Sequence, residues 1–160
     1  EVAHISKVKY LGYTFYRYKG KCRFRVHQKS VAKMRNKIRE LTDRNRGISN
    51  AEREKKYQEY VRGWVEYFRL ADMKGLLVKT DEWARRRIRA VYWKQWKRVR
   101  TRYRILRKLK LEHWRAMELA NSRCGYWRMA EVLNTVITNE IIAKLGYTSM
   151  LDYYLIVYEN

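Results

Sequence analysis

The segment from 85 to 110 carries side chains that could bind phosphate. It holds thirteen Lys or Arg residues in 26 positions and no Asp or Glu. Guanidinium and ammonium groups pair with phosphate oxygens, and at this density they repel one another unless an anion lies alongside. Because no carboxylate within the segment offers an i,i+4 partner, an ordinary solvated face of mixed charge does not explain it. We therefore predict phosphate binding.

A helical wheel over residues 84–106 separates the segment into two faces. Apolar side chains such as Ile88, Val91 and Leu106 share one broad face. A separate narrow stripe, off the apolar face, holds Arg86, Arg89, Lys97, Arg100 and Arg104. Further basic residues flank this stripe, namely Arg85, Lys94, Arg98 and Arg102. One continuous helix would thus follow a phosphate backbone along one side and be buried along the other.

Aromatic residues are interspersed with these charges. Trp93 falls in the middle of the basic stripe and is the candidate for stacking on a nucleobase. We expect Trp83, Trp96 and Tyr92 to anchor the core instead.

The composition agrees with an anionic partner. The 160 residues carry a formal net charge of +22, which favours nucleic acid, an anionic membrane or an acidic protein. Residues 1–110 hold 34 basic and 10 acidic side chains, whereas residues 111–160 hold 4 and 6. Two functional regions, or two faces of one body, are implied. Binding flat on a membrane would need a free apolar face, which neighbouring helices are expected to cover.

Self-contained catalysis is not indicated. The three histidines show no metal-ligand spacing, and no metalloprotease, phosphate-loop or nucleophile-elbow motif occurs. We therefore assign no catalytic and no metal-binding residues. Cys22 and Cys124 predict no disulfide framework, and we expect Cys124 in the core. This cysteine usage, with no apolar run near the ~20 residues of a membrane span, favours the cytoplasm.

The elements that would position these side chains begin with a β-hairpin. Aromatic and β-branched residues at 8–16 and 22–28 predict two strands, with a tight turn at Lys19-Gly20. On the second strand, alternation places Arg23 and Arg25 on the face opposite Phe24 and its apolar neighbours. These two arginines form a second candidate phosphate contact.

Helices are predicted for the rest of the chain. Ser30 is the expected N-cap of the first, whose Lys33, Arg35 and Lys37 are further candidate phosphate ligands. A capping box at 49–52 opens the second, which contains Gly63 and should pack closely there. The third would run through Trp83 to about residue 97 or beyond. Four short helical pieces follow at 112–121, 126–134, 138–145 and 148–158.

Five segments, in this order, resemble one protein family. They are "KYLGYTF" at 9–15, "SVAKMRNKIRELTDRNRGIS" at 30–49, "RGWVEYFRLADMKG" at 62–75, "DEWARRRIRAVYWKQWKR" at 81–98 and "LGYTSMLDYY" at 145–154. Together they resemble the C-terminal part of a group II intron reverse transcriptase, or maturase. The resemblance covers nearly the whole chain.

The resemblance implies a mainly α fold in three parts. Residues 1–28 correspond to a β-hairpin from the end of the polymerase palm. Residues 29–110 correspond to the thumb, or domain X, a three-helix bundle. Residues 111–160 correspond to a small C-terminal helical region. In the family this part grips intron RNA for splicing and the template–primer duplex for copying, with target DNA as a further candidate partner.

The resemblance also implies a Mg²⁺-dependent polymerase site elsewhere in the parent protein. The family's Tyr-Ala-Asp-Asp motif does not occur in this sequence, and no Cys-rich endonuclease pattern follows domain X. We therefore expect a piece of a longer protein that binds nucleic acid without polymerising it, and no cofactor in the piece itself. Two rivals stay open, namely a DNA-binding module of another mobile element and a small enzyme with an unrecognised site.

Overall fold

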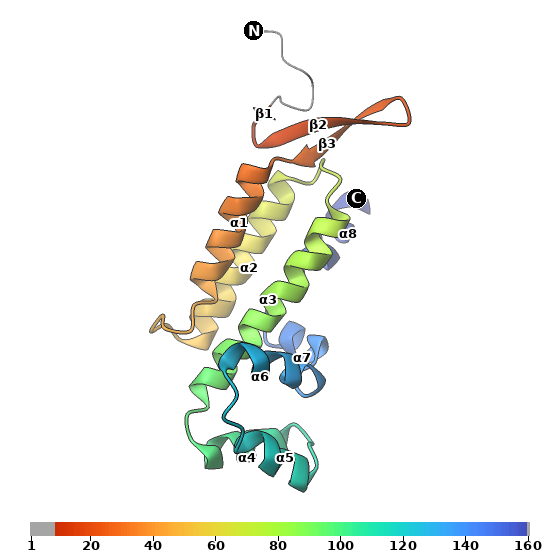
Figure 1. The fold of residues 1–160 in the computed structure, drawn as a ribbon. Helices are drawn as coiled ribbons and strands as arrows, with labels where there is room; N and C mark the ends of the chain where they lie inside the picture. Colours follow the sequence, from red (N-terminus) through yellow and green to blue (C-terminus); the bar gives the residue numbers. More distant parts are fainter. Residues whose placement is uncertain (1–8, 160) are drawn as a thin grey trace.

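The computed structural model describes residues 9–159 and is mainly helical, with a small sheet at one end (Figure 1). The strands are β1 (Lys9–Tyr10), β2 (Tyr13–Tyr18) and β3 (Lys21–Val26). The helices are α1 (Gln28–Leu41), α2 (Asn50–Tyr67), α3 (Lys74–Gln95), α4 (Val99–Lys108), α5 (His113–Ala120), α6 (Tyr126–Val132), α7 (Asn139–Lys144) and α8 (Met150–Glu159), with a 3₁₀ turn, η2 (Leu133–Thr135), after α6. The predicted fold class is confirmed.

The sheet is an antiparallel three-stranded meander. The predicted turn is confirmed, since Lys19 and Gly20 both have positive φ, of 47° and 77°. A second tight turn at Leu11-Gly12 adds the short β1 to the expected hairpin. Burial on β3 is confined to its end at Val26, whereas Phe24 is 41% exposed. The predicted apolar face of this strand is therefore only partly covered.

Helices α1, α2 and α3 lie side by side and enclose the main core (Figure 1). Each contributes an apolar stripe at helical spacing. The fully buried members include Met34 and Ile38 of α1, Val61 and Val65 of α2, and Leu77 and Ile88 of α3. Trp64 of α2 and Phe68, which follows that helix, also belong to this core. The prediction of close packing at Gly63 is wrong, because no atom of a neighbouring element lies within 4 Å of a Cβ placed there.

The helix caps agree with the sequence at α2 and differ at α1. Ser49 caps α2, and its hydroxyl accepts a hydrogen bond from the backbone N–H of Glu52. Helix α1 begins three residues earlier than expected, with His27 rather than Ser30 as its N-cap. Ser30 instead lies inside the first turn, and its hydroxyl donates to the Gly12 carbonyl 3.2 Å away. This bond ties α1 to the sheet.

A single helix across residues 84–106 is wrong. Helix α3 ends at Gln95, Arg98 is extended with φ −98° and ψ 142°, and α4 starts at Val99. The break lets Trp96 and Leu106 both be buried, at 8% and 0% exposure, with α4 packed against α5. Burial of these apolar side chains against the C-terminal helices therefore outweighs the local preference for one continuous helix.

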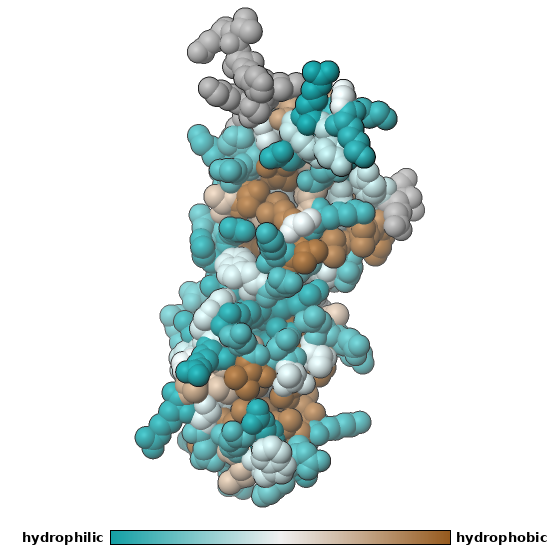
Figure 2. Space-filling view, turned by 45° about the vertical axis from the view of Figure 1, so that its right-hand side comes forward, coloured by the Kyte–Doolittle hydropathy of each residue, from teal (hydrophilic) through white to brown (hydrophobic). Residues whose placement is uncertain are grey.

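The C-terminal pieces appear close to where they were predicted, and they pack back onto the bundle. Helix α6 contacts α3, and α8 contacts both α2 and α3. Cys124 is exposed, so its expected place in the core is wrong. Figure 2 shows a face dominated by hydrophilic side chains, with hydrophobic patches between them. The surface is thus charged while the helices share one connected core.

Candidate nucleic-acid interface

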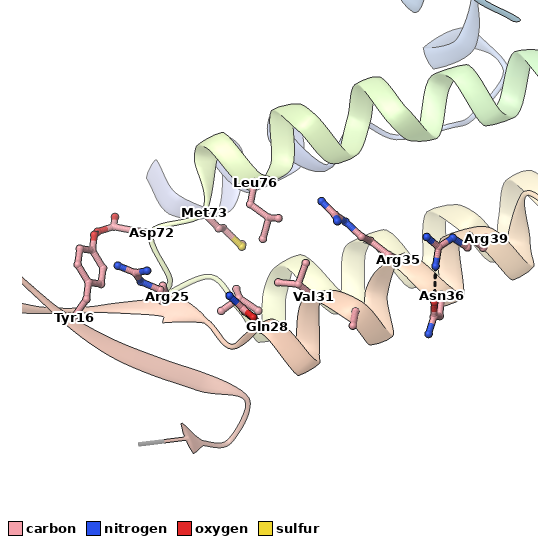
Figure 3. Close-up of a pocket in the computed structure, with 12 residues that line it drawn as sticks. Tyr16, Arg25, Gln28, Val31, Arg35, Asn36, Arg39, Asp72, Met73 and Leu76 are labelled. Carbon is pink, nitrogen blue, oxygen red and sulfur yellow. Dashed lines mark hydrogen bonds between the residues drawn. The ribbon is translucent and has the colours of Figure 1, made fainter. Parts of the chain in front are cut away.

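A groove of about 740 Å³ lies between β3, α1 and the start of α3 (Figure 3). Its apolar lining includes Val26, Val31, Met73 and Leu76, all close to the bundle core. Three arginines add positive charge along it, namely Arg25, Arg35 and Arg39. An elongated basic groove of this kind can accept a phosphate backbone.

Asp72 fixes the hairpin end of the groove. Its backbone N–H donates to the Phe24 carbonyl at 2.8 Å, which joins the α2–α3 connection to β3. Its carboxylate accepts from the Tyr16 hydroxyl at 2.6 Å and from the Arg23 guanidinium at 3.1 Å. The Tyr16 hydrogen bond, reinforced by Arg23, holds the pKa of Asp72 below its usual value. The negative charge of the groove wall is therefore already paired.

The two predicted hairpin arginines have different surroundings. Arg23 forms the ion pair with Asp72 and has a raised pKa because of that hydrogen bond. Arg25 stacks over the Tyr16 ring, with its guanidinium carbon 4.4 Å from the ring centroid. It makes no ion pair within residues 9–159, so its donors are open to an anion in the groove.

The predicted cations of α1 lie on two sides of that helix. Arg35 and Arg39 are one turn apart on the side that lines the groove (Figure 3). Lys33 and Lys37 are exposed outside the groove lining, and Lys37 pairs with Glu40 at 2.8 Å. Only Arg35 of the three predicted α1 residues is brought into the groove, together with Arg39, which the sequence reasoning missed although it follows Arg35 at i+4.

The predicted stripe on α3 is not a free surface. Arg89 is 4% exposed, and its guanidinium donates to the Ile137 carbonyl and the Asn139 side chain, both at 2.8 Å. Desolvation by burial lowers the pKa of Arg89 to about 10. Arg86 donates to Glu131 at 2.8 Å and to the Trp127 carbonyl at 3.3 Å. These arginines hold the C-terminal helices on α3, because the tail covers the face that the wheel left open.

Trp93 does not serve as a stacking platform. Its side chain is 1% exposed, with the Arg102 guanidinium 4.3 Å from the ring centroid and the Trp96 ring at 5.9 Å. Arg102 also donates to the Trp96 carbonyl at 2.8 Å. The expectation that Trp96 and Tyr92 are core residues is confirmed, whereas Trp83 is only half-buried.

Lys94 and Arg85, two of the residues predicted to flank the stripe, also lie on α3, near its end and near its middle. Lys94 donates to the side chain of Asn45 in the loop after α1. Arg85 is half-buried beside Arg89 and makes no hydrogen bond within the described part of the chain. Neither continues a basic stripe toward α4.

The remaining predicted residues form a second basic surface on and before α4. Arg100 and Arg104 line a shallow hollow of about 570 Å³ together with Tyr103, Arg107 and Lys108. Lys97 and Arg98, which precede the helix, are exposed as well. Arg107 donates to the Leu111 carbonyl, whereas Arg100 and Arg104 have no hydrogen bond or ion pair within residues 9–159. We call residues 97–108 the α4 surface.

Residues 31–111 match the family model described as "Group II intron, maturase-specific domain". The matched residues make up just over half of the chain. The chain belongs to this family. No curated protein matches it. Membership supports a function in group II intron splicing, and it confirms the resemblance inferred from the ordered segments.

The maturase-specific match runs from the first turn of α1 to just beyond α4. It therefore contains Arg35, Arg39 and the whole α4 surface. The hairpin with Arg25 and the tail from α5 to α8 lie outside it. The two basic surfaces of the matched part lie toward opposite ends of the bundle, beside the hairpin and at α4 (Figure 1).

No metal site is formed within residues 9–159, where no group of three His, Cys, Asp or Glu side chains could hold an ion. The described residues thus do not fit the Mg²⁺ that the resemblance implies for the parent polymerase. No helix in the same part of the maturase chain is long and apolar enough to cross a membrane.

Proposed function

We propose that this chain is the RNA-binding thumb and domain X part of a group II intron reverse transcriptase. It would hold intron RNA during splicing and the template–primer duplex during copying, in a reducing cytosol. Polymerisation would use Mg²⁺ held by aspartates outside this chain, because the sequence lacks the Tyr-Ala-Asp-Asp motif. The function rests on binding rather than on chemistry within the chain.

The basic groove is the observation that carries this proposal. Arg25, Arg35 and Arg39 come from two different elements and line one surface. The acidic residue in that lining, Asp72, is already paired with Arg23. The net field of the groove is therefore positive, which favours a duplex recognised through its backbone phosphates.

The α4 surface would make a second, independent contact with RNA. Arg100 and Arg104 are one helical turn apart on an exposed face, with no acidic partner within the described residues. Two basic surfaces at opposite ends of the bundle suit a large folded RNA better than a short oligonucleotide. Splicing and copying could each use one or both of them.

Competition binding tests the class of nucleic acid. Labelled structured RNA bound to the chain would be displaced by unlabelled structured RNA, duplex DNA or single strands at a fixed salt concentration. We expect structured RNA to compete best. Duplex DNA competing equally well or better would instead favour the DNA-binding module of a mobile element.

Charge removal in the groove tests the site itself. Arg35→Gln with Arg39→Gln should weaken binding to all structured RNAs similarly and flatten the slope of log affinity against log salt by up to ~2. The matched control is Lys55→Gln with Lys144→Gln, which removes two exposed cations outside the groove lining. Equal effects of both pairs would show that net charge, and not the groove, determines affinity.

A further inference from the structure

Four arginines and three aromatic rings gather on a surface beyond the groove, where α1, the loop after it, α3 and α6 meet. Each ring has a guanidinium carbon within 6 Å of its centroid. The arginines are Arg39, Arg44, Arg86 and Arg87, and the rings are Trp83, Tyr126 and Trp127. We call this set the arginine–aromatic face.

Trp127 is a fixed and accessible ring on this face. Its side chain is 43% exposed, although aromatic rings this large are normally more deeply covered. Arg86 stacks on it with a guanidinium-to-centroid distance of 4.3 Å. Arg86 is in turn held by the Glu131 carboxylate at 2.8 Å. A ring held in this way loses little conformational entropy when a ligand stacks on it.

Tyr126 and Arg44 provide a ring and an open cation beside it. Tyr126 is 39% exposed, and the Arg44 guanidinium carbon lies 4.9 Å from its centroid. Arg44 is exposed and makes no hydrogen bond or ion pair through its guanidinium within residues 9–159. Asp43, its neighbour, accepts instead from the backbone N–H of Asn45. The donors of Arg44 can therefore reach a phosphate.

The arginine–aromatic face is continuous with the basic groove. Arg39 lines the groove and also lies 5.7 Å from the Trp83 centroid. Arg87 lies 5.4 Å from the same ring and lines a small hollow of about 100 Å³ together with Arg44 and Trp127. A strand leaving the groove at Arg39 would therefore meet Trp83 and then Trp127.

We propose that the arginine–aromatic face binds unpaired nucleotides of an RNA strand whose duplex portion lies in the groove. Bases would stack on the exposed rings of Trp127 and Tyr126, and Arg44 would contact a phosphate between them. Stacking on aromatic rings and guanidinium planes is how proteins hold unpaired bases, whereas duplex binding relies on phosphates and shape. The inference rests on the proposed function, since it extends the same RNA beyond the groove.

The test compares three RNA probes that share one hairpin duplex. One is blunt, one carries a short single-stranded uridine overhang, and one carries an overhang of equal length made of abasic nucleotides. Stacking predicts that the uridine overhang improves affinity about tenfold over the blunt hairpin. The abasic overhang keeps the phosphates but not the bases, so it should recover only a small part of that gain. A DNA overhang on the same hairpin would show whether 2′-hydroxyls contribute.

Variants of the full chain locate the gain. Trp127→Leu and, separately, Arg44→Gln should reduce the overhang's advantage while leaving affinity for the blunt hairpin within about twofold. The matched control is Tyr158→Leu, since Tyr158 is 57% exposed with Lys74 5.8 Å from its ring centroid but lies on α8. This control should keep the full overhang advantage. If Trp127→Leu lowers the melting temperature, Arg44→Gln and the abasic probe decide the question.

The outcomes separate the two proposals. Tight binding of the blunt hairpin with no gain from the uridine overhang would overturn the arginine–aromatic face and leave the proposed function standing. Equal gains from uridine and abasic overhangs would overturn stacking and indicate phosphate contacts alone. Failure to bind any structured RNA would overturn the proposed function itself.

Discussion

The carboxylate of Asp81 in α3 accepts a hydrogen bond of 2.9 Å from the backbone N–H of Met150, the first residue of α8. The same carboxylate accepts from the backbone N–H of Leu151 at 3.0 Å and from the Ser149 hydroxyl at 2.8 Å. It is 3% exposed. A buried acid in the bundle thus caps a helix of the tail, which makes the tail part of the same folded body.

Replacing Asp81 by Asn should loosen this junction. The amide has one acceptor oxygen and would turn donors toward backbone N–H groups that need acceptors. We expect a loss of ~1–3 kcal/mol in the free energy of unfolding, measured by denaturant titration. Asp152→Asn, an exposed change in the first turn of α8, removes the same charge and should cost below ~1 kcal/mol. Equal losses in both variants would contradict the capping role.

The placement of Asp81 shows where prediction from the sequence ends. Asp81 lies within α3, which begins at Lys74, and its own neighbours in sequence give it no capping role. Local spacing identified the hairpin turn at Lys19-Gly20 and the helix cap at Ser49, since each depends on neighbours in sequence. The helix end that Asp81 caps begins at Met150, 69 residues later in the sequence. A local sequence pattern cannot predict a contact over that separation.

The positions of the candidate phosphate-binding side chains were likewise predictable only where they depend on local sequence. Arg35 on α1 and Arg100 on α4 are exposed side chains that lie beside other cations. Arg89 and Trp93 do not, because the tail and the turn after Gln95 cover them. A helical wheel drawn for one segment does not show a second helix that packs against it but lies about 40 residues later in the sequence.

Arg89→Gln should therefore destabilise the fold rather than only weaken RNA binding. It removes a buried guanidinium from the Ile137 carbonyl and from Asn139, and we expect a loss of ~2–3 kcal/mol. Arg85→Gln removes the same charge from a half-buried position with no hydrogen bond within the described residues and should cost below ~1 kcal/mol. Thermal melts of both variants without RNA make the comparison. An unchanged melt for Arg89→Gln would show that the tail does not depend on this contact.

Trp64→Ala should cost ~3–5 kcal/mol, because the ring fills the core beside Phe68 at a centroid distance of 4.7 Å. That loss is a large fraction of the stability of an ordinary domain. Circular dichroism melts would measure it, with Tyr67→Ala, a 54% exposed aromatic of the same helix, as the comparison. A Trp64→Ala melt no lower than that of Tyr67→Ala would contradict the assigned helix face.

Two glycine replacements should change the free energy of unfolding in opposite directions. Gly63→Ala in α2 introduces a methyl group into open space and should stabilise the chain by ~0.5–1 kcal/mol, since alanine favours the helix. Gly12→Ala should destabilise it, because φ is +86° and the new Cβ would lie 3.0 Å from the Ser30 hydroxyl and 3.1 Å from the Phe68 ring. Denaturant midpoints of both variants test this, and destabilisation by Gly63→Ala would reveal a close neighbour at that position.

Removing charge from the α4 surface should weaken RNA binding independently of the groove. Arg100→Gln with Arg104→Gln takes two exposed guanidinium groups from one face of α4, and the fold should survive because neither is hydrogen-bonded within the described chain. Binding of structured RNA measured between 50 and 200 mM salt should show a slope smaller by up to ~2.

The decisive measurement combines this α4 pair with Arg35→Gln and Arg39→Gln. The two sets of residues lie on different elements with no shared partner, so their effects on binding free energy should add within ~0.5 kcal/mol when one RNA spans both surfaces. A short hairpin that reaches only the groove should respond to the groove pair alone. If the α4 pair weakens that short hairpin as strongly as a large RNA, the two surfaces do not act as separate contacts, and long-range charge accounts for both effects.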